Sequence, residues 1–190
     1  MEQEIKSLED DQKEMRIAFL GGFAGQLVSG IIWLIASIVS VVISNQVGML
    51  TLFFGCMGIF PLTQLTLKLM GRRANVRKEN QLWQLGSQVA FTVPINFILV
   101  GAIILFHPDW FFPAAMIIVG SHYLPFMTLY GMKMFGILAA ILVISGITIG
   151  MYIPLFFSLG GWLTSVLLIL FAFIGKWQVQ QEESIRSMGV

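Results

Sequence analysis

Charged residues are scarce in this sequence. They make up 11% of its 190 residues, whereas 57% are hydrophobic. Soluble domains carry about 25% charged residues, so this chain lacks the charge to cover a water-exposed surface. Lipid is therefore its expected surrounding. The formal net charge of +1 argues against a nucleic-acid partner, which would require a basic excess.

Cysteine and an N-terminal basic region are also lacking. Cys56 is the single cysteine and lies in an apolar run, so no disulfide can form within one chain. The first 14 residues are acidic, whereas a cleavable signal peptide begins with a basic region. We therefore expect the first apolar run to be retained.

Acidic residues are absent from the interior of every long apolar run. All ten lie at or beyond the ends of these runs: Glu2, Glu4, Glu9, Asp10, Asp11, Glu14, Glu79, Asp109, Glu182 and Glu183. Proton relays, sodium sites and carboxylate acid–base catalysis usually need an embedded acid. Because no complete catalytic or metal-binding set is present, we expect a protein that is not an enzyme and carries no cofactor.

Six apolar runs are long enough to cross a bilayer, which needs about 20 residues of helix. They predict an all-α polytopic membrane protein, a bundle of six transmembrane helices over residues 17–175. An acidic segment, 1–16, precedes the bundle and a tail, 176–190, follows it. The first span is overlong and should tilt or emerge at the interface. The predicted spans are 17–44, 47–70, 85–106, 111–130, 135–153 and 156–175, the last two divided at Pro154.

The basic residues indicate the orientation. If the N-terminus is cytoplasmic, all 11 fall on the cytoplasmic side: Lys6, Lys13, Arg16, Lys68, Arg72, Arg73, Arg77, Lys78, Lys133, Lys176 and Arg186. The outer connections then carry none, as the positive-inside rule requires. We therefore predict an inner-membrane protein with both termini in the cytoplasm.

Two predicted cytoplasmic segments carry opposite charge. The segment 1–16 has a charge of −3, and the loop 72–84 has a charge of +3. The pair of Ser7 and Asp10 fits a capping box, which predicts a short helix in the first segment. The two segments could dock together, but we favour the interpretation that each is solvated, with the basic loop near anionic headgroups.

Small residues recur at helix-packing spacing. Gly21, Gly25 and Ser29 share one face of the first span, and Gly146 and Gly150 share a face of the fifth. Such faces let helices approach closely. Packing within the monomer is the favoured role. The alternative is that these faces bind a second copy or another membrane protein.

Uncharged polar residues gather in the first four spans, mainly in their inner halves. The candidates for ligand binding are Gln26, Gln64, Asn96, Ser121 and His122. Prolines lie near them, and a mid-helix proline frees the carbonyl four residues earlier. One hypothesis is a polar pocket between the second, third and fourth spans, open towards the cytoplasm and centred on His122. The simpler interpretation, slightly favoured, is that these residues form interhelical hydrogen bonds and kinks.

Two functional hypotheses follow. The first is a small-molecule carrier, channel or sensor with a neutral polar pocket near the midplane. The second is a non-catalytic partner that binds another membrane protein or lipid.

Residues 120–126, Gly-Ser-His-Tyr-Leu-Pro-Phe, are followed by Tyr-Gly-Met-Lys at 130–133. This pattern resembles a signature of an uncharacterised bacterial membrane-protein family. The resemblance implies a multi-span inner-membrane protein and supplies no activity.

Overall fold

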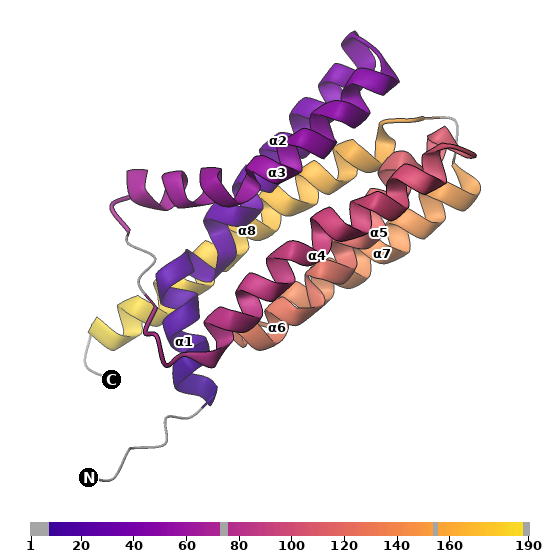
Figure 1. Ribbon diagram of the computed structural model, residues 1–190. Helices are drawn as coiled ribbons and strands as arrows, with labels where there is room; N and C mark the ends of the chain where they lie inside the picture. Colours follow the sequence, from indigo (N-terminus) through magenta and orange to yellow (C-terminus); the bar gives the residue numbers. More distant parts are fainter. Residues whose placement is uncertain (1–7, 73–75, 154–155, 188–190) are drawn as a thin grey trace.

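The computed structural model describes residues 8–72, 76–153 and 156–187, without the side chains of 186 and 187. This part of the chain is helical, and it contains six helical stretches long and apolar enough to cross a membrane (Figure 1). The predicted all-α, six-helix architecture is therefore confirmed.

The first predicted span consists of two helices rather than one. α1 covers Leu8–Phe19, η1 covers Leu20–Gly22 and α2 covers Phe23–Val42. Residues 20–22 have φ values of 50°, 60° and 79°, a left-handed conformation that glycine adopts readily and other residues rarely. These angles break the continuous helix that we predicted over 17–44. The predicted cap Ser7 lies outside the described residues.

The next two spans each contain an internal proline. α3 covers Asn45–Leu69 with Pro61 inside it, and α4 covers Gln81–Ile104 with Pro94 inside it. α4 begins earlier than the predicted residue 85 because Asn80 caps it, accepting a hydrogen bond from the Leu82 N–H at 3.0 Å. Beyond its midpoint, α3 turns away from the long axis of the bundle (Figure 1).

The fourth predicted span is also divided. It comprises the short helix η2 over Pro108–Trp110, then α5 over Phe111–His122 and α6 over Leu124–Tyr130. The break at Tyr123 immediately precedes the first turn of α6, which contains Pro125, a residue without an N–H to continue the hydrogen-bonding pattern.

The last two spans are separate helices, as predicted. α7 covers Met134–Tyr152 and α8 covers Leu159–Ser187. Pro154, where we placed the division, lies outside the described residues. α8 extends well beyond the predicted end at 175, so the tail begins as a continuation of the membrane helix.

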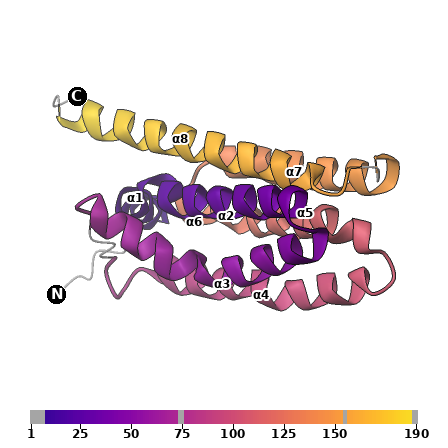
Figure 2. The same ribbon diagram turned by 90° about the horizontal axis from the view of Figure 1, so that it is seen from above.

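The helices pack around an apolar centre. α2 lies between α3 and α8, and α5 packs against α7. Figure 2 shows α3 and α4 together along one side, with α8 on the opposite side. Trp33, Phe112 and Phe135 are among the largest fully buried side chains. The beginning of α1 and the end of α8 lie at the same end of the bundle, called here the α1 end.

Most of the predicted small-residue contacts lie inside the chain. A Cβ on Gly21 would lie 3.0 Å from the Gly175 carbonyl oxygen of α8. A Cβ on Gly146 would lie 2.9 Å from the Pro113 carbonyl oxygen, and one on Gly150 would meet the Trp110 ring at 2.9 Å. These glycines therefore serve packing within the monomer, the favoured role. Gly25 is less crowded, with Thr63 as its nearest neighbour at 3.7 Å.

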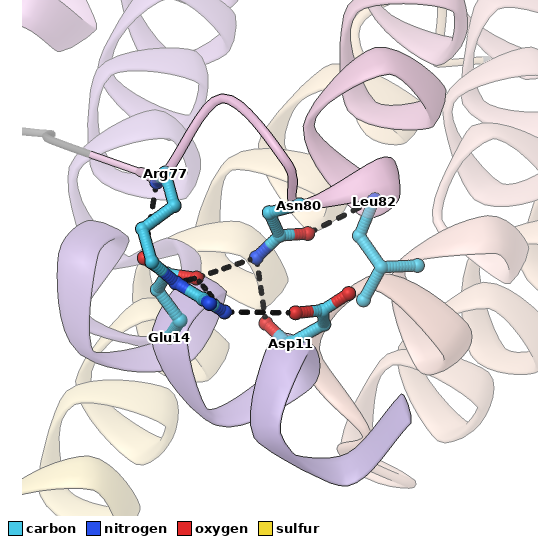
Figure 3. A network of polar contacts seen from close by, with 5 residues as sticks. All are labelled: Asp11, Glu14, Arg77, Asn80 and Leu82. Atoms are coloured by element: carbon cyan, nitrogen blue, oxygen red, sulfur yellow. Dashed lines mark hydrogen bonds and ion pairs between the residues drawn. The ribbon is translucent and has the colours of Figure 1, made fainter. Parts of the chain in front are cut away.

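The acidic and basic segments contact each other, contrary to the solvated interpretation that we favoured. The Arg77 guanidinium lies 3.0 Å from the Glu14 carboxylate and 3.1 Å from the Asp11 carboxylate. The Asn80 amide donates to Glu14 at 2.9 Å and to the Asp11 carbonyl at 3.2 Å (Figure 3). The hydrogen bond with Glu14 raises the pKa of Arg77. Several directed hydrogen bonds to one carboxylate explain why docking prevails over solvation.

Two further arginines join helices at the α1 end. Arg16 donates to the Glu182 carboxylate at 3.0 and 3.1 Å and to the Tyr130 carbonyl at 2.7 Å. Arg72 donates to both oxygens of Glu183 at 3.0 Å. These hydrogen bonds raise the pKa of Arg72, because they outweigh the opposite effect of burial. These contacts connect α1 and the chain after α3 to α8.

Candidate functional site

A cavity of about 500 Å³ lies inside the half of the bundle nearest the α1 end. Its volume is within the range of about 300–1,000 Å³ typical of small-molecule sites. Side chains of α1, α2, α3, α4, α5 and α6 line it. The cavity lies among the second to fourth spans, where we predicted a pocket, and the first span contributes to its wall as well.

Gln26 of α2 is the most unusual residue of the cavity. It is 2% exposed, and neither its amide oxygen nor its amide nitrogen has a hydrogen-bond partner in the described part of the chain. Burying an amide without a partner costs roughly 1–3 kcal/mol in proteins. An unpartnered amide at a cavity wall is therefore a candidate ligand contact.

His122, at the end of α5, also lines the cavity. Its Nδ1 lies 3.2 Å from the Thr92 hydroxyl oxygen of α4. That hydroxyl donates its single hydrogen to the Val89 carbonyl at 2.7 Å, so we assign the proton of the His122–Thr92 contact to Nδ1. In the neutral imidazole, Nε2 is then an acceptor.

The prolines coincide with the cavity wall, as the sequence suggested. Pro61 and Pro94 line the cavity, and so do Met57 and Ala90, which lie four residues earlier. A proline leaves the carbonyl of the residue four positions earlier without its helical donor. Backbone acceptors are thus available at the cavity wall, which Gln64 also lines.

Two predicted site residues do not reach the cavity. Ser121 is exposed and its hydroxyl donates to the Ile118 carbonyl at 2.8 Å. Asn96 is not among the lining residues either. The ligand-binding role predicted for these two residues therefore stays a prediction, without support from the cavity. Of the five candidates, Gln26, Gln64 and His122 are brought together.

The cavity is less polar and less open than predicted. Met15 and Phe19 of α1 line it, and the Phe19 ring stacks on Trp83 of α4 with centroids 5.8 Å apart. α1 therefore covers the end that we expected to be open. Sequence reasoning missed this cover, as well as Thr92 and Cys56, since their residue types give no signal within apolar helices. Cys56 is a free thiol that lines the cavity.

The lining carries no Asp, Glu, Lys or Arg among the described residues. It also lacks a metal site, because no group of three or more His, Cys, Asp or Glu side chains lies together in the described chain. The arrangement can therefore hold an uncharged molecule through apolar contacts and a few hydrogen bonds.

These features define a multi-span, all-helical membrane protein with a cavity between its helices. Residues 8–176 match a family of unknown function (DUF7010), and the chain belongs to this family. This agrees with the resemblance to an uncharacterised membrane-protein family. No curated protein and no solved structure matches the chain.

Proposed function

We propose that this protein binds a small uncharged molecule inside the membrane and acts as a carrier, channel or sensor for it, without catalysis. The observation that carries this proposal is the buried Gln26 amide, which lies without a partner at the wall of a 500 Å³ cavity. A helix bundle that needed no ligand would lose nothing by placing an apolar residue there.

The proposal includes an inner-membrane location with both termini in the cytoplasm. The ion pairs of Arg16, Arg72 and Arg77 all lie at the α1 end. Concentration of cations at one end supports this orientation through the positive-inside rule. The alternative role, a partner for another membrane protein, receives less support because Gly21, Gly146 and Gly150 are covered by the chain itself.

The experiment is photolabelling with an uncharged diazirine-bearing phenol, followed by mass spectrometry of the purified protein in detergent. Gly25 lines the cavity and a Cβ there would have Thr63 as its nearest neighbour, so Gly25→Leu should place a side chain in the cavity and obstruct it. A Cβ on Gly101 of α4 would have no neighbour within 4 Å, and Gly101 does not line the cavity, so Gly101→Leu is the matched control.

We expect labels on the buried lining residues Val93 and Tyr123 in the unmodified protein and in Gly101→Leu, and a clear decrease of these labels in Gly25→Leu. Absence of labels at the lining, or equal labelling in both variants, would refute the proposed binding site.

A further inference from the structure

We infer that the ligand is a single-chain lipid-like molecule with an uncharged amide or hydroxyl head, which enters from the bilayer between α3 and α4 and places its head at Gln26. This inference rests on the proposed function and narrows the class of ligand.

The first argument is the exposure of the cavity rim. Met57 and Phe60 of α3 and Phe91 of α4 line the cavity, yet they are 56%, 61% and 69% exposed. In a membrane-spanning helix, side chains that are apolar and exposed face hydrocarbon. α3 and α4 make few contacts with each other, and α3 turns away from the long axis of the bundle beyond its midpoint (Figure 1). The cavity therefore opens sideways towards lipid.

The second argument is the cover at the α1 end. Met15 and Phe19 close the cavity there, and Arg77, Asn80 and Gln12 hold α1 in place. The Gln12 amide donates to the Thr128 carbonyl of α6 at 2.8 Å. A solute arriving from water would have to displace this helix, whereas a molecule dissolved in the bilayer meets the open rim.

The third argument is the charge of the lining, which fixes the type of head. A carboxylate or phosphate in this cavity would be desolvated without a cation among the lining residues. The arginines Arg16 and Arg77 already pair with Glu182 and Glu14. The Gln26 amide offers one acceptor oxygen and a nitrogen with two donors. A primary amide or a hydroxyl can donate a hydrogen bond to the Gln26 oxygen and accept one from the Gln26 nitrogen.

The fourth argument is size. About 500 Å³ lies in the lower part of the range for ligand sites. This volume suits one alkyl chain with a compact head better than the two chains of a phospholipid.

The test uses two photoreactive probes with the same diazirine-bearing 18-carbon chain, a fatty primary amide and the corresponding fatty acid. Each is mixed into phosphatidylcholine nanodiscs that hold the full chain, and labelled residues are quantified by mass spectrometry. The variants are Gln26→Leu and, as the matched control, Gln88→Leu, because Gln88 of α4 is exposed and absent from the lining.

We expect the amide probe to label the buried lining residues Val93 and Tyr123 at least tenfold more than the acid probe does, because the carboxylate would be desolvated in the cavity. Gln26→Leu should lower labelling by the amide probe about tenfold, the size of effect that one or two hydrogen bonds produce, and Gln88→Leu should leave it unchanged. Butanamide, a water-soluble amide with a short chain, should not compete with the amide probe.

Equal labelling by amide and acid, unchanged labelling by the amide probe in Gln26→Leu, or competition by butanamide would overturn the inference. The phenol probe separates this failure from failure of the proposed function. If the phenol still labels the cavity, including in Gln26→Leu, the cavity is intact and only the ligand class is wrong. If the phenol does not label it, the proposed function fails as well.

Discussion

The side chain of Gln26 opposes stability when the cavity is empty, because its amide is buried with both polar atoms unpaired. Replacing it with an apolar side chain of similar size removes this cost. We predict that Gln26→Leu raises the stability of the ligand-free protein by roughly 1–3 kcal/mol. Thermal unfolding in one detergent would measure it, with Gln88→Leu as the control. A loss of stability would indicate that Gln26 is an interhelical partner, the simpler interpretation of the sequence.

A second residue-scale prediction concerns the left-handed glycines. Gly21 and Gly71 have φ values of 60° and 70°, but only Gly21 faces a neighbour, since nothing lies within 4 Å of a Cβ on Gly71. Gly71→Ala should cost about 1–2 kcal/mol for the left-handed conformation alone. Gly21→Ala should cost more, because its Cβ would press on the Gly175 carbonyl at 3.0 Å.

Unfolding temperatures of the two alanine variants, measured side by side, check this difference. If Gly21→Ala were no less stable than Gly71→Ala, the close approach of η1 and α8 would be wrong.

At the same scale, the sequence predicted part of the candidate site and missed the rest. Gln26, Gln64 and His122 could be chosen because uncharged polar residues are costly inside a membrane and need a partner. Ser121 and His122 face different directions, because adjacent residues do not share a helix face. Hydropathy does not reveal which of the two faces the cavity, because it does not fix how α5 is rotated against its neighbours.

At the scale of elements, α1 acts as a cover over the cavity. It is amphipathic: its buried residues Met15 and Ala18 face the bundle, and its charged residues reach Arg77 and Glu182. A run of apolar residues continues from α1 into α2, so hydropathy alone places both in one span. The division arises from backbone angles at Leu20, Gly21 and Gly22, which the sequence indicates only through the paired glycines.

The cover predicts a response to the loss of Arg77. Arg77→Gln should free α1, because the side chain that contacts both Asp11 and Glu14 is shortened and uncharged. We expect faster hydrogen exchange and faster limited proteolysis of residues 8–19, with little change in α5 and α7. Rising salt should likewise speed exchange and proteolysis of these residues in the unmodified protein, since partly exposed ion pairs are screened.

Lys78→Gln is the matched control for this experiment, because Lys78 is exposed and adjacent to Arg77. The two variants lose the same charge from the same loop. Equal protection of α1 in the unmodified protein and in Arg77→Gln would mean that the other contacts of α1, polar and apolar, hold the cover without Arg77.

At the scale of the whole molecule, the presence of six long apolar runs was enough to predict the architecture. The reason is that a bilayer admits only internally hydrogen-bonded helices of fixed minimum length. The way the six stretches pack was not predictable, because helices in lipid associate through local fit rather than through a hydrophobic pattern. The contacts of α2 with α8, which join the beginning and end of the chain, are an example.

The orientation supplies the last prediction. Cys56 is the single cysteine, so a Cys56→Ala background allows new cysteines to be read one at a time. His107, Lys133 and Gln180 are exposed, at the turn between α4 and α5, before α7 and late in α8. With cytoplasmic termini, a membrane-impermeant maleimide added to intact cells should label His107→Cys and leave Lys133→Cys and Gln180→Cys unlabelled. Permeabilised cells should label all three. If only His107→Cys and Gln180→Cys were labelled, the chain would have to cross the membrane an odd number of times. If only Lys133→Cys and Gln180→Cys were labelled, the orientation of the whole protein would be the inverse of the predicted one. The ion-paired arginines Arg16, Arg72 and Arg77 lie at the α1 end, so inversion would also place them outside, against the positive-inside rule.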